Sequence, residues 1–199
     1  MSEARQKRGW YSRGYLPHCD IEGRVQFITF RLADAIPLRA IKGIEAQIAD
    51  LPDDKQEAER RKRLEKWLDQ GFGACHLARP EIAEIVQEEI LRRHGHDYEL
   101  LAWTVMPNHV HAMVNLSDNV NLAEMVQCWK GRSARRCNLA LGRKGRFWFR
   151  EYWDRFIRSE THFTNTVAYI EQNPVKAKLC EAPADWTYGS AYSKGCHAG

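Results

Sequence analysis

The sequence predicts an α+β fold in which helices pack against one antiparallel sheet. Short stretches of alternating apolar residues indicate strands, and longer stretches with apolar residues at helical spacing separate them. Two neighbouring strand-like stretches are joined by the dipeptide PN, which is typical of a hairpin turn. A chain of 199 residues is long enough for one core, so we expect a single domain over 1–199 with its helices on one face of the sheet.

The first part of the chain is predicted to contain one strand and a long helical region. Residues 24–34, RVQFITFRLAD, alternate well enough to form a strand. A helical region over 38–70 follows, with a turn at Pro52 and an end at Gly71. Its second part is amphipathic but densely charged, so we expect a charged helical excursion around 44–78 that protrudes from the fold.

The rest of the chain is predicted to complete the sheet and its helices. Pro80 opens a helix that stops at Gly95, and a β-hairpin is expected from the strands 98–106 and 109–116. The remaining elements are a helix over 121–142, a short strand or turn over 147–159, a helix over 159–174 capped by Ser159, a coil over 185–192 and a short C-terminal tail.

Composition and the first residues predict the compartment. No apolar run approaches the roughly 20 residues that cross a bilayer, and MSEARQKRGWYSRG lacks the apolar segment of a signal peptide. We therefore expect a cytoplasmic protein. The six cysteines are scattered without a C-x-x-C pair, so they are expected to be reduced, and their spacing gives no support to a structural zinc site.

Positive charge is concentrated in two blocks although the formal net charge is only +4. Between Asn121 and Arg150, eight Lys or Arg residues stand against Glu124 alone, and aromatic residues alternate with cations in GRKGRFWFREYW. Cations hold phosphates and rings stack on bases, so this pattern indicates a nucleic acid partner. The alternatives are a solvated helix face for the cations and core packing for the rings. The candidate DNA-binding residues are Arg13, Lys130, Arg132, Arg135, Arg136, Arg146 and Arg150.

The stretch MPNHVHAMV places His109 and His111 one residue apart in an apolar run. On a strand both rings point to the same face, while Val110 points away. Paired imidazoles converge on one point and are common metal ligands, which indicates a divalent metal site. Mg²⁺ or Mn²⁺ would need a further oxygen ligand, and a substrate phosphate can supply one. The alternative is a pair of core histidines that are satisfied by hydrogen bonds.

A second candidate group lies in VAYIEQNPVK, residues 167–176. Tyr169 and Asn173 are four residues apart and share a face if the segment is helical. Pro174 disfavours helical geometry at the residue before it, so we expect the helix to end at Asn173. From spacing alone, a packing tyrosine and a helix cap are the better explanation. Lys176, beyond the turn, is either a DNA phosphate contact or a solvated lysine.

Together these motifs resemble the REP-associated tyrosine transposases, which are relatives of the single-tyrosine transposases within the HUH nuclease superfamily. The resemblance rests on QFITFRLAD, MPNHVHAMV, FWFREYWDRFIR, YIEQNPVKAKL and DWTYGSAY in this order, and it covers most of the chain. It implies a ferredoxin-like or RRM-like antiparallel sheet with helices behind it. It also makes the charged helical region around 44–78 an insertion. The N-terminal RGWYSRGYLPHCD only loosely resembles the family's DNA-reading segment.

The resemblance also implies roles for individual residues. His109 and His111 would be metal ligands for Mg²⁺ or Mn²⁺, and Asn173 would be the third ligand through its amide. Tyr169 would be the nucleophile, whose phenol must lose its proton on attack because its pKa is ordinarily about 10. The partner would be single-stranded or hairpin DNA.

The implied activity is a metal-dependent single-stranded DNA endonuclease and strand transferase that acts on hairpin-forming repeats through a 5′-phosphotyrosine. Such a protein would act in the cytoplasm on the nucleoid. Two alternatives stay open: a non-catalytic single-stranded DNA- or RNA-binding module on an RRM-like sheet, and a hydrolase of small phosphates. Tyr152 and Tyr98 are the alternative nucleophiles, and a monomer and a homodimer fit the sequence equally.

Overall fold

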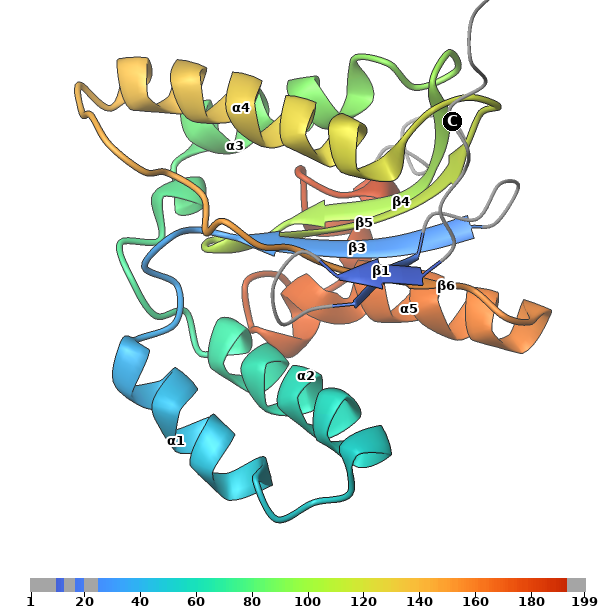
Figure 1. Cartoon of the computed structure of the whole chain (residues 1–199). Coiled ribbons are helices and arrows are strands. Elements are labelled where there is room, and N and C mark those ends of the chain that lie inside the picture. Colours follow the sequence, from blue (N-terminus) through green and yellow to red (C-terminus); the bar gives the residue numbers. More distant parts are fainter. Residues whose placement is uncertain (1–9, 13–16, 20–24, 193–199) are drawn as a thin grey trace, which may run out of the picture.

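The fold is built on a four-stranded antiparallel sheet, which confirms the predicted α+β class. The computed structural model describes residues 10–12, 17–19 and 25–192 (Figure 1). Its strands are β1 (Trp10–Ser12), β2 (Pro17–Cys19), β3 (Val25–Arg31), β4 (Tyr98–Val105), β5 (His109–Leu116) and β6 (Trp153–Phe156). The main sheet has the order β4-β5-β3-β6, and β1 pairs with β2 in a separate two-stranded sheet.

The predicted hairpin of β4 and β5 is present, and its register places the two histidines. Across the β3–β5 pair, His111 lies opposite Thr29 and His109 lies opposite Arg31. Met106 N donates a hydrogen bond of 2.8 Å to the carbonyl oxygen of His109, which closes the turn. Because β5 lies between β4 and β3, both histidines are held on an inner strand of the sheet.

One face of the sheet is covered by α3 (Pro80–Leu91) and α4 (Leu122–Ala140), as Figure 1 shows. Tyr98 of β4 links the two helices, because its hydroxyl donates to the carbonyl of Ile90 at 2.6 Å and accepts from Trp129 Nε1 at 2.9 Å. These residues belong to the main apolar core of the protein.

The opposite face carries α5 (Glu160–Lys176), whose Ile170 packs with Phe27 in a smaller core. The expectation that the helices lie on one face is therefore wrong. The reason lies in β3, where residues 26–31 are all buried. Successive side chains of a strand point to opposite faces, so Phe27 and Ile28 are both buried only if helices pack on both faces of the sheet.

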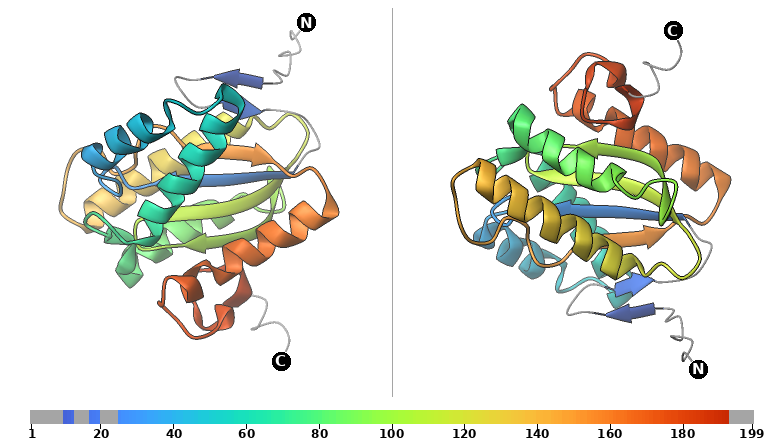
Figure 2. Two further views of the ribbon diagram at one scale, coloured as in Figure 1. Left: turned by 90° about the horizontal axis from the view of Figure 1, so that it is seen from below. Right: turned by 90° about the horizontal axis from the view of Figure 1, so that it is seen from above.

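The charged region forms a helical hairpin of α1 (Leu38–Ile48) and α2 (Asp53–Asp69), which are separated at Pro52 as predicted. The hairpin extends below the sheet, on the same side as α5 (Figures 1 and 2). It is also anchored, because apolar side chains of both helices are buried with the main core, namely Ile44, Ile48, Leu64 and Leu68. Gly71, with a φ of +67°, follows the end of α2, a conformation that glycine adopts without strain.

Helix α5 continues through Pro174 to Lys176, so the expected helix end at Asn173 is wrong. Proline removes a single N–H donor from the helix, and the burial of the Pro174 ring offsets that loss. Tyr169 and Asn173 therefore lie one turn apart on a continuous helix.

The last part of the described chain packs against the hairpin. Trp186 Nε1 donates to the carbonyl of Val105 at 3.2 Å, and Val105 N donates to the carbonyl of Tyr188 at 2.8 Å. Two short 3₁₀ helices complete the secondary structure, η1 (His76–Ala78) and η2 (Pro183–Asp185). None of the helices described here is long and apolar enough to cross a membrane.

Candidate metal and nucleophile site

The rings of His109 and His111 face each other on the side of the sheet that carries α5. Both side chains are buried, and their Nε2 atoms are 3.1 Å apart. Burial lowers the pKa of His109 to about 3, and burial together with the neighbouring His109 lowers the pKa of His111 well below its ordinary value. Both imidazoles are therefore neutral at physiological pH, which is the form that binds metal ions.

The other ring nitrogen of each histidine has a partner of its own. His111 Nδ1 lies 2.8 Å from Thr29 Oγ1, and His109 Nδ1 lies 2.7 Å from Asn108 Oδ1. Such outer contacts orient metal-binding histidines by leaving the Nε2 lone pair directed into the site. The two Nε2 atoms are thus presented together.

This arrangement fits a divalent ion. Two nitrogens bound at right angles about 2.1 Å from one ion lie about 3.0 Å apart, close to the 3.1 Å between the histidine Nε2 atoms. Within the described ranges, no group of three or more His, Cys, Asp or Glu side chains is placed to hold a metal. A third ligand must therefore be another kind of donor. Asn173 offers one, since its Oδ1 is buried without a hydrogen-bond partner.

Tyr169 lies beside the histidines. Its ring centroid is 5.3 Å from that of His111 and 6.0 Å from that of Phe27. Its hydroxyl is covered, and the side chain of Asn173 beside it lowers the pKa of the phenol slightly against the larger effects that follow. Burial raises the pKa of Tyr169 above its usual range, and the carboxylates of Glu65 and Asp69 raise it further. The phenol is therefore protonated at neutral pH and needs help to lose its proton.

Comparison with known proteins defines the family. The sequence matches the family described as "Transposase IS200 like" over residues 59–173, more than half of the chain. The chain belongs to the IS200-like transposase family. It is 27% identical over 103 residues to a putative REP-associated tyrosine transposase of Haemophilus influenzae, and 27% identical over 93 residues to a REP-associated tyrosine transposase of Escherichia coli.

These relatives are matched only in part. Each alignment covers 47% of this chain, and 58% and 54% of the two relatives, so the match spans little more than half of their length. A solved structure of a REP-associated tyrosine transposase bound to a REP hairpin superimposes with a TM-score of 0.54 at 18% identity. It covers 100% of this chain and 87% of that one, which shows a shared fold.

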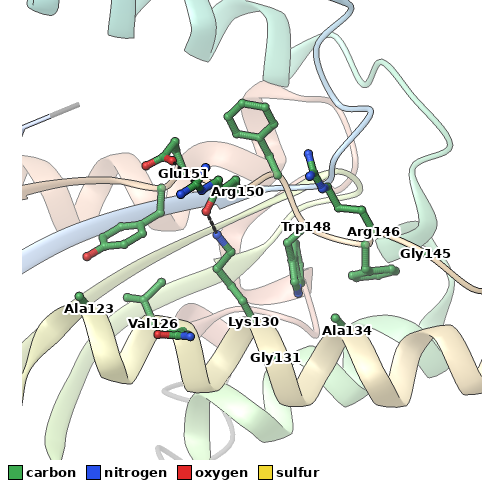
Figure 3. A pocket seen from close by; sticks show the side chains of 14 residues that line it. Ala123, Val126, Lys130, Gly131, Ala134, Gly145, Arg146, Trp148, Arg150 and Glu151 are labelled. Carbon is green, nitrogen blue, oxygen red and sulfur yellow. Dashed lines mark hydrogen bonds and ion pairs between the residues drawn. The ribbon is translucent and has the colours of Figure 1, made fainter. Parts of the chain in front are cut away.

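In this IS200-like transposase, the predicted DNA-binding cations fall into different places. Lys130, Arg146 and Arg150 line a groove of about 540 Å³ between α4 and the segment 145–152 (Figure 3). Trp148, Phe149 and Tyr152 line the same groove, and Lys130 Nζ donates to the carbonyl oxygen of Arg150 at 2.7 Å. The cations are exposed or partly exposed there, but Trp148 and Tyr152 are buried in the main apolar core, so core packing accounts for these two rings while Phe149 is partly exposed.

Other predicted cations have protein partners or lie elsewhere. Arg132 and Arg136 of α4 bind the buried carboxylate of Glu89 on α3, each at 3.0 Å. Arg135 is exposed on α4, and Arg13 lies outside the described residues. Lys176 is close to the candidate site, since its Nζ is 5.3 Å from the centroid of the Tyr169 ring.

The two alternative tyrosines have other surroundings than Tyr169. The hydroxyl of Tyr98 is engaged by Ile90 and Trp129 on the α3–α4 side, and Tyr152 lines the groove. Sequence reasoning missed the acidic residues of α2 and Arg155 of β6, whose guanidinium carbon is 5.5 Å from the centroid of the Phe27 ring. No sequence signal places Glu65 and Asp69 near Tyr169, because the charge pattern of a helix does not show which part of the protein the helix packs against.

Proposed function

We propose that this protein is a single-stranded DNA endonuclease and strand transferase that acts on hairpin-forming repeats through a 5′-phosphotyrosine at Tyr169. The observation that carries the proposal is the paired Nε2 atoms of His109 and His111 beside the Tyr169 ring. A pure binding module has no need for paired neutral imidazoles next to a phenol. The relatives named REP-associated tyrosine transposases, and the solved relative bound to a REP hairpin, support hairpin DNA as the partner.

The chemistry is an exchange of two phosphorus–oxygen bonds. A divalent ion, Mg²⁺ or Mn²⁺, held by His109, His111 and Asn173 would draw charge from the non-bridging oxygens of the phosphodiester. The Tyr169 oxygen attacks phosphorus and loses its proton, and the bond to the 3′ oxygen breaks. The 5′ phosphate stays on Tyr169 and a 3′-hydroxyl is released. Because one ester replaces another, a free 3′-hydroxyl can reverse the step and join strands.

The raised pKa of Tyr169 gives the neighbouring cations a role. Arg155 lowers the pKa of the phenol against the opposing effects of burial, Glu65 and Asp69. Lys176, close to the Tyr169 ring, supplies a second positive charge as the phenolate forms. A bound phosphodiester would place further negative charge here, so these cations favour both the substrate and the ionised nucleophile.

The groove of Figure 3 is the proposed binding surface for the DNA that flanks the cleaved bond. Its cationic side chains, Lys130, Arg146 and Arg150, meet phosphates, and the partly exposed ring of Phe149 is available to stack with an unpaired base. A second, small cavity is lined by Phe149, Tyr152 and Thr29. Since Thr29 contacts His111, the groove wall adjoins the histidine side of the sheet.

The proposal is tested with stem-loop oligonucleotides from the repeats that flank the gene. The wild-type protein with Mn²⁺ should form a covalent adduct that survives a denaturing gel, and EDTA should prevent it. Tyr169→Phe should abolish the adduct while binding is retained, and Tyr152→Phe, the matched control, should still form it. An adduct in the Tyr169→Phe variant contradicts the assignment. Binding without cleavage of any stem-loop would favour the alternative, a non-catalytic DNA- or RNA-binding module.

A further inference from the structure

Asn108 connects the α1–α2 hairpin to the candidate metal site. Its side chain is buried at the turn that precedes β5. The amide nitrogen Nδ2 donates to the carbonyl oxygen of Leu68 at 3.2 Å and to that of Phe72 at 3.1 Å. The amide oxygen Oδ1 lies 2.7 Å from Nδ1 of His109. One side chain thus joins the end of α2 to a histidine of the site.

These contacts determine the orientation of the Asn108 amide. The two acceptors, on Leu68 and Phe72, are backbone carbonyls, and a carbonyl oxygen can only accept a hydrogen bond. The NH₂ group must therefore point toward α2, and Oδ1 must point toward His109. Reversing the amide would place its oxygen against two carbonyl oxygens, which repel it and offer no hydrogen.

The fixed amide in turn decides which nitrogen of His109 carries the proton. Oδ1 accepts, so Nδ1 of His109 must donate. A neutral imidazole has one N–H, so Nε2 of His109 is left with its lone pair directed at His111 Nε2, 3.1 Å away. This is the tautomer that a metal ligand acting through Nε2 requires.

His111 is not constrained in the same way. Its partner at Nδ1 is the hydroxyl of Thr29, which can donate or accept. In the metal-free protein, His111 can place its proton on Nε2 and donate to His109 Nε2. For His111 to bind a metal ion through Nε2, its proton can move to Nδ1, and the Thr29 hydroxyl can turn to accept a hydrogen bond from that N–H. The pair therefore consists of one fixed and one adjustable imidazole.

We propose that Asn108 is a positioning residue that holds His109 in the Nδ1–H tautomer, and that the end of α2 is the anchor that orients it. The charged helical hairpin is then a support for the metal site. The tautomer is a property of the metal-free chain. Its consequence for metal affinity rests on the proposed function of His109 as a ligand.

The anchor is suited to this role. The carbonyl of Leu68, in the last turn of α2, is held from two sides, because it accepts from Gly71 N at 3.0 Å and from the Asn108 amide at 3.2 Å. The chain beyond α2 is tightly fixed. Gly73 has a φ of +88°, and an added Cβ there would lie 2.8 Å from the carbonyl oxygen of Asp34. The ring of Phe72 packs on Trp67 at 4.7 Å between centroids.

The first test observes the tautomer directly in the wild-type protein. Long-range ¹H–¹⁵N spectra of the ¹⁵N-histidine-labelled, metal-free chain distinguish a protonated from an unprotonated ring nitrogen. We expect His109 to carry its proton on Nδ1. A proton on Nε2 of His109 would overturn the proposal, and no variant needs to fold for this result. The experiment uses neither DNA nor metal, so it stands apart from the test of strand cleavage.

The second test removes the amide. In Asn108→Ala we expect His109 to show a mixture of tautomers, and Mn²⁺ affinity measured by calorimetry to fall about 10- to 100-fold, the usual effect of losing an outer-shell partner. Asn138→Ala is the matched control, because the Asn138 amide also donates to a backbone carbonyl, that of Gly145 at 2.9 Å, but on α4. This control should leave tautomer and affinity unchanged. An Asn108→Ala protein that keeps the Nδ1–H tautomer and wild-type Mn²⁺ affinity contradicts the proposal.

Discussion

Two pairs of arginines in the predicted DNA-binding set should respond differently to substitution. The first pair, Arg132 and Arg136, binds the carboxylate of Glu89, which is only 3% exposed. The second pair, Arg146 and Arg150, lines the groove and is exposed to solvent. We therefore compare the double variants Arg132→Gln/Arg136→Gln and Arg146→Gln/Arg150→Gln in stability and in DNA binding.

The effect on stability follows from the burial of Glu89. Removing the partners of a buried carboxylate costs about 3–5 kcal/mol when the pair is fully buried. The side chains of Arg132 and Arg136 are 47% and 43% exposed, and Arg92 remains 3.8 Å from Glu89. We therefore expect a smaller loss, about 1–2 kcal/mol in the free energy of unfolding, for Arg132→Gln/Arg136→Gln. The groove variant should remain within about 0.5 kcal/mol of wild type.

The effect on DNA binding follows from the charge that the groove presents to the phosphates. Each phosphate that a cation neutralises on a single strand contributes about 0.7 to the slope of log K against log salt concentration. Replacing both groove arginines in Arg146→Gln/Arg150→Gln should therefore reduce the slope by about 1.4. Urea unfolding measures the stability, and fluorescence anisotropy with a labelled stem-loop across a salt series measures the slope. The reverse pattern, with the slope reduced by the Arg132/Arg136 variant alone, would refute this division of the arginines.

Two further predictions concern pH. Burial and the neighbouring Arg31 lower the pKa of Lys130 to about 8 against the opposing effect of Glu151. DNA affinity should therefore fall as the pH rises through about 8, because Lys130 loses its charge. The Lys130→Gln variant should bind DNA more weakly than wild type and should show no such decline when anisotropy is measured across pH. Because the charge of Glu65 raises the pKa of Tyr169, Glu65→Gln should speed adduct formation where Glu65 is ionised, and the gain over wild type should vanish at acidic pH where Glu65 is protonated. A rate advantage that persists unchanged into acid would mean that charge is not the cause.

The sequence predicted the local elements well because their signals are local. The hairpin of β4 and β5 follows from two apolar stretches around a turn dipeptide, and the separation of α1 from α2 follows from Pro52. The face on which each helix packs did not follow. Phe27 and Ile28 are both apolar, so the pattern of β3 fits a cover on either face or on both.

The candidate site was predictable to the extent that it depends on spacing within one element. His109 and His111 share a face because they are two residues apart on a strand. The contact of Asn108 with Leu68 spans 40 positions, and the pairing of Arg136 with Glu89 spans 47. Such contacts depend on how distant elements meet, which no local pattern contains.

The most direct measurement of the central claim is the identity of the residue that carries DNA. The wild-type protein is incubated with Mn²⁺ and a flanking stem-loop, the adduct is digested with nuclease and protease, and the modified peptide is sequenced by mass spectrometry. We predict a nucleotide phosphate on the peptide that contains Tyr169. A phosphate on Tyr152 or Tyr98 would contradict the account of the nucleophile.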